Sequence, residues 1–315
     1  MKTPSRLVLA LTVLPWMALA LACPANTAPT TTDATDDADS AGTPDDADST
    51  GPPDDADGAA DTQTPLEAVR VVTLNLRCLS DDWDARLPII ADGLAAVDPD
   101  LVGLQEVCEE NGVRDALTEL IAALEARTGR RYTPYRAVTH RAWSTYDEGI
   151  AILSALPLEA TQTVALPTGT FPRKVLLARV TRPAGGALVF ATTHLDQLDT
   201  TTRKLQAEAV GAALDAFGGS DEARVLTGDL NEPPIGGWVH STLVAAGLTD
   251  LWAALHPGDA GATFPARNPV DRIDYVWFAA GASGLAGQAI ARILTAAVGG
   301  VTGSDHLGLA ATLAR

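Results

Sequence analysis

Apolar and polar residues follow two different periodicities along residues 65–315. Short runs of Val, Leu and Ile indicate buried strands, and longer segments with helical periodicity indicate amphipathic helices. Consecutive strands fill the middle of this body and strands alternate with helices on its flanks, which predicts a mixed α/β sheet system packed with helices. With about 250 residues and no internal linker, the body is long enough for one large domain. The predicted strands are 69–76, 101–105, 149–154, 175–181, 188–193, 224–227, 273–278 and 307–313, and the predicted helices are 84–97, 113–127 and 201–217.

One stretch, Val225–Glu232, joins a predicted buried strand to a polar end. Its residues VLTGDLN place Asp229 and Asn231 two positions apart, so on an extended chain both side chains project to the same side. Their hard oxygen atoms suit a magnesium ion or the polar groups around a phosphate. Gly-Asp-x-Asn also occurs in ordinary turns. Whether this motif indicates a functional site therefore depends on the residues at the other strand ends.

Polar residues of a particular kind flank most of the other predicted strands. Any one of them could be a helix cap, a turn residue or a solvated surface group. Together, two His, several acids and two Asn form the inventory that hydrolysis of a phosphate ester with a bound hard cation requires. Strand ends are suitable places for it, because a rigid sheet holds short side chains on one surface. The candidates are Asn75, Glu106, Glu148, His194, Asp229, Asn231, Asp274, Asp305 and His306.

Residues 1–22 have the pattern of an export signal. Basic residues precede a short apolar run that ends in small residues, and the run is too short for a good membrane span. Cys23 stands where a lipoprotein signal places its acylated cysteine, although the same residues also fit an ordinary Ala-x-Ala cleavage site. We favour lipidation of Cys23 and therefore expect an exported protein, anchored in the cell envelope or otherwise secreted.

Residues 23–64 differ in composition from the body. Asp, Ala, Thr, Ser, Gly and Pro dominate, and Asp-Asp-Ala-Asp recurs at positions 36, 45 and 54. Such a segment buries too little apolar surface to offset chain entropy, which predicts a disordered tether. A calcium-binding repeat is the alternative, but the unit lacks the central Gly and closing Glu of a calcium loop. We therefore interpret the repeat as a solvated spacer.

The charge of the chain does not indicate a polyanion-binding surface. The formal net charge is −18, and the body stays acidic when the Asp-rich tether is set aside. Arg173, Lys174, Arg203 and Lys204 could contact a phosphate locally, but we expect them to be solvated surface charges.

Seven short motifs in order resemble the endonuclease/exonuclease/phosphatase superfamily, the deoxyribonuclease I-like fold. The resemblance covers essentially the whole body. It implies a four-layer α/β sandwich of two mixed β-sheets flanked by helices, and Mg²⁺-dependent hydrolysis of phosphodiesters or phosphomonoesters, with Mn²⁺ or Ca²⁺ as substitutes. The motifs are TLN ending at Asn75, LQE at Glu106, EGIAILS from Glu148, TTHLD around His194, GDLN ending at Asn231, RIDYV around Asp274 and SDH ending at His306.

The resemblance also implies a role for each candidate. Glu106 is the expected principal metal ligand, with Asn75 and Asp305 completing the cluster, and Asn231 orients the scissile phosphate. Two carboxylate–imidazole pairs, Glu148–His194 and Asp274–His306, are expected on opposite sides of the phosphorus, because a carboxylate stabilises a protonated imidazole. We place His306 and Asp229 jointly on the side of the attacking water.

The substrate stays open at this level. Export argues against a role in chromosomal DNA repair, and the acidic body disfavours tight nonspecific DNA binding without excluding DNA. We expect a monomeric phosphodiesterase acting on nucleic acid or a phospholipid head group. The alternatives are a phosphomonoesterase on inositol-type phosphates and a non-catalytic surface binding module on the same fold. Trp143 is the one candidate for lipid contact, and we expect it to pack beside the site instead.

The family's site requires the strand ends at Asn75 and Glu106 to be neighbours, and this has a consequence for the cysteines. Cys78 and Cys108 follow those residues closely and are the only cysteines of the body. In an exported protein we therefore expect a disulfide between them, with a pair of buried free thiols as the alternative.

Overall fold

The structure is a computed structural model that describes residues 68–219 and 221–315, all within one compact unit, Asp61–Arg315. The expected signal peptide at residues 1–22, the tether at 23–64 and the lipidation of Cys23 fall outside the described residues. None of the described helices is long and apolar enough to cross a membrane.

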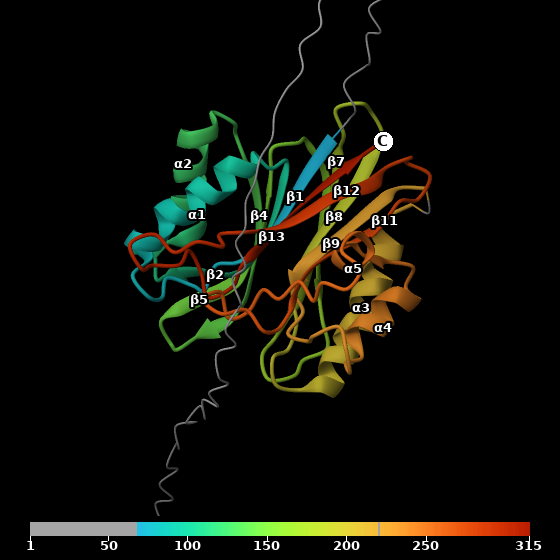
Figure 1. Ribbon diagram of the computed structural model, residues 1–315. Helices are drawn as coiled ribbons and strands as arrows, with labels where there is room; N and C mark the ends of the chain where they lie inside the picture. The colour runs from blue at the N-terminus through green and yellow to red at the C-terminus, as the bar shows by residue number, and fades with distance from the viewer. Residues whose placement is uncertain (1–67, 220) are drawn as a thin grey trace, which may run out of the picture. The chain divides into compact units, whose positions relative to one another are not determined.

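Two mixed β-sheets form the centre of the fold (Figure 1). In each, one parallel strand pair, β1–β2 or β8–β9, is flanked by antiparallel neighbours. The first sheet has the order β12 (Ala286–Ile293), β13 (Gly308–Ala314), β1 (Ala68–Asn75), β2 (Leu101–Glu110), β5 (Tyr146–Ser154) and β4 (Thr133–Ala142), with β3 (Arg114–Asp115) paired to β2. The second has the order β10 (Thr249–Asp250), β11 (Asp274–Ala279), β9 (Ala223–Asp229), β8 (Ala187–His194), β7 (Lys174–Thr181) and β6 (Leu158–Ala165).

Helices cover the outer face of each sheet, on opposite sides of Figure 1. On the first sheet, α1 (Trp83–Val97) and α2 (Ala116–Thr128) bury Leu94 and Leu120 against residues of β1 and β2. On the second, α3 (Thr200–Phe217) and α4 (Val239–Ala245) bury Val210 and Leu243 beside residues of β8 and β9. A third core lies between the sheets and includes α5 (Leu251–Leu255). These layers confirm the predicted four-layer α/β sandwich.

The strands that the apolar pattern did not predict lie at or near the sheet edges. β4, β6 and β12 are mostly exposed or half-buried and carry few consecutive apolar residues. An edge strand packs fewer of its side chains into a core, so its sequence lacks the buried run that marks a central strand. The edge strand β4 proves important, because it carries one wall of the candidate site.

The predicted disulfide is confirmed. Cys78 and Cys108 are bonded, with their Cα atoms 4.8 Å apart. The chain beyond β1 continues beside β2, because Leu76 N donates to Gln105 O at 2.9 Å and Cys78 N donates to Glu106 O at 3.1 Å. The bridge therefore fastens the ends of the two strands that carry Asn75 and Glu106.

Removal of the bridge should destabilise the protein. Cys78→Ser opens a link between residues 30 apart in the chain, so we expect the free energy of unfolding to fall by roughly 3 kcal/mol. Urea denaturation of oxidised protein measures this loss. The reduced wild type is the matched control and should approach the variant. An unchanged urea midpoint would show that the bridge contributes no stability.

Candidate active site

The side-chain amide of Asn75 joins the two sheets at one edge. Asn75 Nδ2 donates to Glu106 Oε1 of the first sheet at 3.0 Å and to Asp229 Oδ2 of the second at 3.1 Å. Asn75 is fully buried, and its Oδ1 accepts a hydrogen bond from Arg77 N at 2.9 Å. One amide thus holds two carboxylates that come from different layers of the fold.

Glu106 reaches Asn75 because β2 is irregular at this point. The pairing of β2 with β5 shifts register between Leu104 and Val107, and Glu106 has a φ of 49°. A bulge with a left-handed residue re-aims a side chain away from the regular alternation of the strand. Glu106 is only partly buried and lines a cavity, so its carboxylate is accessible to a ligand.

Asp229 lies between the two predicted histidines. Its Oδ2 is 3.6 Å from His194 Nε2 and 3.8 Å from His306 Nε2. The sheet register explains this placement, because His194 is paired with Asp229 in β8–β9 and Asp274 is paired with Asp229 in β11–β9. Burial, together with the adjacent Asp274 carboxylate, raises the pKa of Asp229 to about 7 even though His306 acts to lower it.

The two histidines have opposite protonation preferences. His306 Nδ1 lies 3.0 Å from Asp274 Oδ2, and although burial acts to lower it, the carboxylates of Asp274 and Asp229 raise the pKa of His306 to about 10. Burial and the nearby Arg173 hold the pKa of His194 well below its ordinary value. At neutral pH the site therefore holds an imidazolium at His306 and a neutral imidazole at His194.

Asn231 follows Asp229 in a tight turn. Asn231 N donates to Asp229 Oδ1 at 2.9 Å, and Asn231 Nδ2 donates to Leu195 O at 3.1 Å. Asn231 has a φ of 52°, which Asn tolerates better than most residues. These bonds fix the carboxylate of Asp229 and the loop after His194.

The structure differs from the expected pairing of Glu148 with His194. Glu148 Oε2 lies 3.8 Å from His140 Nε2, and Glu148 Oε1 lies 3.9 Å from Arg173 Nη1. In the β4–β5 ladder His140 is the partner of Glu148, whereas His194 is carried by the other sheet beside Asp229. Burial and the Glu106 carboxylate raise the pKa of Glu148 to about 7.

Arg173 is buried, contrary to the expectation of a solvated surface charge. Its side chain is only 2% exposed, and its Nε has no hydrogen-bond partner among the described residues. Arg203 is buried as well, but its Nε contacts Glu232 Oε2 at 3.1 Å. Arg173 lines the same cavity as Glu106, so its guanidinium is a candidate contact for a phosphate group.

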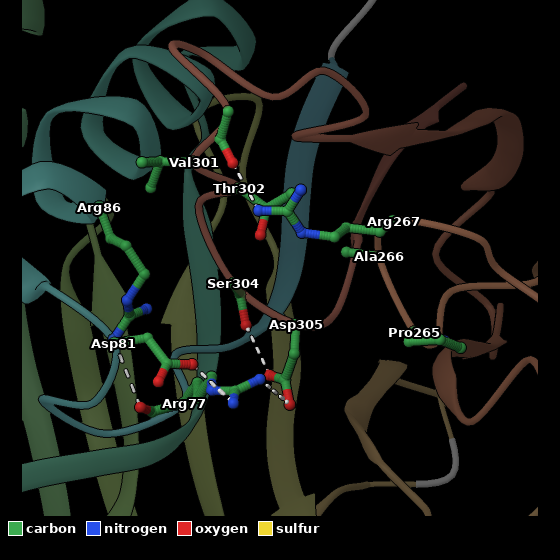
Figure 2. A pocket seen from close by; sticks show the side chains of 11 residues that line it. Arg77, Asp81, Arg86, Pro265, Ala266, Arg267, Val301, Thr302, Ser304 and Asp305 are labelled. Carbon is green, nitrogen blue, oxygen red and sulfur yellow. Dashed lines mark hydrogen bonds and ion pairs between the residues drawn. The ribbon is translucent and has the colours of Figure 1, made fainter. Parts of the chain in front are cut away.

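Asp305 is held by an arginine. Its Oδ2 lies 2.8 Å from Arg77 Nη1, and Figure 2 shows Arg77 reaching between Asp81 and Asp305 at a cavity of about 410 Å³. Arg86 fixes this region from within: its guanidinium donates to Leu76 O at 2.8 Å and to Gly303 O at 2.9 Å. Arg86 therefore ties the end of β1 to the loop that carries Asp305.

Two sets of side chains could hold a cation. Glu106 fits one, because its carboxylate is accessible and the carbonyl oxygen of Asn75 retains a second lone pair. Asp305, the other expected member of this set, is paired with Arg77. Asp229, Asp274 and His306 form the other set, with ligand atoms within 4.8 Å of one another. In this second set the imidazole of His306 is hydrogen-bonded to Asp274 and favours the protonated form, which does not bind a cation. We therefore prefer the Glu106 set as the cation site.

A further cluster, Cys78, Cys108 and Glu148, also brings ligand-type atoms together. It does not qualify as a metal site, because the two sulfur atoms are joined in the disulfide and are not thiolates. The cluster arises from the β2–β5 register, which sets Cys108 opposite Glu148.

The motifs did not identify three contributors to the site. His140 lies on the unpredicted edge strand β4, Arg173 directly precedes β7, and Arg86 lies inside α1. Arg173 could have been found from its position, since the start of an antiparallel neighbour of β8 falls at the same sheet edge as His194. For His140 and Arg86 we find no comparable sequence signal.

Comparisons with known proteins identify the family and the fold. The model of the Endonuclease/Exonuclease/phosphatase family matches residues 72–306. Among solved structures, an endonuclease/exonuclease/phosphatase family protein from Leptotrichia buccalis is 17% identical, with a TM-score of 0.65 over 77% of this chain and 98% of that chain. D. rerio TDP2 complexed with single strand DNA product is 18% identical, with a TM-score of 0.62 over 78% of this chain and 98% of the other. The human Nocturnin catalytic domain with bound sulfate anion is 18% identical, with a TM-score of 0.63 over 78% and 94%.

The likeness to these structures shows the fold alone, and a search of curated proteins finds no match. The family match is independent of them and spans every site motif from β1 to His306. The chain therefore belongs to the endonuclease/exonuclease/phosphatase family, whose members are hydrolases of phosphoester bonds.

Proposed function

We propose that the protein is a Mg²⁺-dependent phosphodiesterase that cleaves its substrate by in-line attack of water. The observation that carries this proposal is the position of Asp229, a buried carboxylate between two imidazoles and in hydrogen bond with Asn75. It supplies a proton acceptor beside groups of suitable charge for a phosphate.

Asp229 is the proton acceptor in this mechanism. A pKa near the working pH suits a general base, and the pKa of Asp229 is raised to about 7. His306 does not share that role, because its pKa of about 10 keeps it protonated at neutral pH. The imidazolium instead stabilises the negative charge that grows on the phosphoryl oxygens, and Asp274 holds it in place.

His194 lies beside Asp229, on the side of the attacking water. Its neutral imidazole donates a hydrogen bond to a phosphoryl oxygen without repelling the cationic Arg173, whose guanidinium lines the cavity beside Glu106. When bound at Glu106 and Asn75, Mg²⁺ would act as a Lewis acid that neutralises charge on the phosphate. The chain's own residues then orient the substrate and accept the proton.

We propose the cell envelope as the place of action. The support is the export pattern of residues 1–22, Cys23 at the expected cleavage point and the polar composition of residues 23–64. The disulfide is consistent with this proposal, because such bonds persist mainly outside the cytosol.

Turnover of a simple diester tests the function. We expect hydrolysis of bis-p-nitrophenyl phosphate with Mg²⁺ and its loss with EDTA, measured by release of nitrophenolate. His194→Ala should lower kcat on the order of 10² to 10⁴, the usual size of a lost proton-transfer or electrostatic contribution. His240→Ala, outside the site, is the control and should retain activity. Absence of EDTA-sensitive turnover on this diester, plasmid DNA, RNA, sphingomyelin and inositol phosphates would favour a binding module instead.

The pH dependence tests the division of roles. Asp229 must be unprotonated, so kcat/KM should rise with pH through about 7, and His306 must be protonated, so it should fall through about 10. Asp274→Asn removes the charge that raises the pKa of His306 and should move the alkaline limb to lower pH. Glu222→Gln, which affects a carboxylate at Arg179, should leave the profile unchanged. An alkaline limb that stays in place in Asp274→Asn would refute the role of His306.

A further inference from the structure

A cavity of about 320 Å³ extends outward from the candidate site. Its lining includes the charged side chains of Glu106, Glu148, Arg141 and Arg173 and the rings of His140, Trp143 and Phe171. Small-molecule sites commonly have volumes of about 300 to 1,000 Å³, so the space suits one substituent of a larger substrate. We call it the Trp143 cavity.

Trp143 is the exposed member of this aromatic wall. Its side chain is 69% exposed at the tip of the β4–β5 hairpin, where Trp143 and Ser144 have φ values of 46° and 59°. Such angles favour Gly or Asn, so local backbone energetics do not explain a Trp here. The expectation that Trp143 packs beside the site is thus only partly met: it lines the cavity and contacts Tyr146 edge-on at 6.2 Å, but stays largely open to solvent.

The hairpin holds this ring in a defined place. Arg141 Nη1 donates to Asp147 Oδ1 at 2.8 Å, and Arg141 Nη2 donates to Ser144 O at 3.2 Å across the turn. Thr145 N closes the turn on Ala142 O at 2.9 Å. The exposed ring is therefore carried by a braced turn, which limits the entropy lost when a ligand stacks on it.

The aromatic rings and the buried cation that line the Trp143 cavity suit a planar ligand that carries a phosphate. His140 and Phe171 are stacked on each other, with ring centroids 4.6 Å apart. Arg173 is buried beside them with an unpartnered Nε, and it lies over Phe171 at 5.9 Å. Flat rings next to an unsatisfied guanidinium match a base attached to a phosphate.

A lipid fits this lining less well. Among the lining residues Ala142 is the only aliphatic one, so an acyl chain would gain little buried apolar area. Two acids, Glu106 and Glu148, and two guanidinium groups, of Arg141 and Arg173, line the cavity, so its charge alone does not select the ligand. The aromatic rings and the near absence of aliphatic lining favour a nucleotide.

We propose that the Trp143 cavity is a nucleobase subsite, in which the base next to the scissile phosphate stacks on Trp143. The proposal rests on the phosphodiesterase function and specifies its substrate as single-stranded nucleic acid or a nucleotide diester. A base in a duplex is stacked and paired, so only an unpaired base can enter such a subsite.

Two esters with the same leaving group test the subsite in the full-length protein with Mg²⁺. Thymidine 5′-(p-nitrophenyl phosphate) carries a base, and methyl p-nitrophenyl phosphate does not. The wild type should prefer the thymidine ester. Trp143→Ala should raise KM for that ester on the order of 5- to 100-fold, as expected for a lost base–aromatic stack, and leave the methyl ester within about twofold. Trp143→Phe should retain most of the preference.

Trp238→Ala is the matched control. Trp238 is another exposed tryptophan, 58% exposed, and lies outside the lining of the Trp143 cavity. It should behave as the wild type on both esters. Equal KM changes on the two esters in Trp143→Ala, or the same loss in Trp238→Ala, would overturn the subsite. So would faster turnover of sphingomyelin vesicles than of the thymidine ester, with both Trp variants impaired on vesicles.

A binding measurement separates this inference from the proposed catalysis. Thymidine 5′-monophosphate in EDTA should quench tryptophan fluorescence in the wild type and lose most of that effect in Trp143→Ala. Quenching without turnover of any ester would refute the phosphodiesterase and preserve the subsite. Turnover with identical quenching in both proteins would refute the subsite and preserve the phosphodiesterase.

Discussion

The active edge of this protein depends on one buried amide. Asn75 donates to Glu106 of one sheet and to Asp229 of the other, and no other side chain of the described site bonds to both. Two buried or partly buried carboxylates repel one another, and a shared donor offsets part of that cost. The disulfide fixes the end of β1 to β2, and Arg86 fixes it to the loop before His306. Both links hold the backbone that carries Asn75 in place.

The two sheets contribute different groups to the site at their interface. The first sheet supplies accessible oxygen atoms at Glu106 and, from the loop before β13, the imidazole of His306, whereas the second supplies Asp229, Asp274 and His194. Sheet register sets the protonation states, since the pairing of Asp274 with Asp229 concentrates negative charge around His306. A protonated His306 follows from this pairing, whereas burial and the nearby Arg173 keep His194 neutral.

The sequence predicted the central strands well and the edge strands poorly. The missed edge strands affect the candidate site. Buried runs such as LVGLQ and VLTGD carry a strong apolar signal, so Asp229 was placed correctly at the end of β9, whereas β2 continues to Glu110 and Glu106 lies within it at a bulge. β4 has no such run, and without it the register partner of Glu148, His140, could not be foreseen. Burial of Arg173 likewise depends on a loop that begins at the unpredicted edge strand β6, and the bulge at Glu106 depends on long-range pairing that local pattern does not encode.

The central claim is that the cation belongs to the Glu106 side and proton transfer to the Asp229 side. Binding of Mn²⁺, followed by electron paramagnetic resonance in the absence of substrate, tests it most directly. The account predicts that Glu106→Gln weakens Mn²⁺ binding by at least about tenfold, as loss of a ligand should, while Asp274→Asn leaves the affinity nearly unchanged. Strong loss in Asp274→Asn together with wild-type affinity in Glu106→Gln would place the cation among Asp229, Asp274 and His306 and contradict the account.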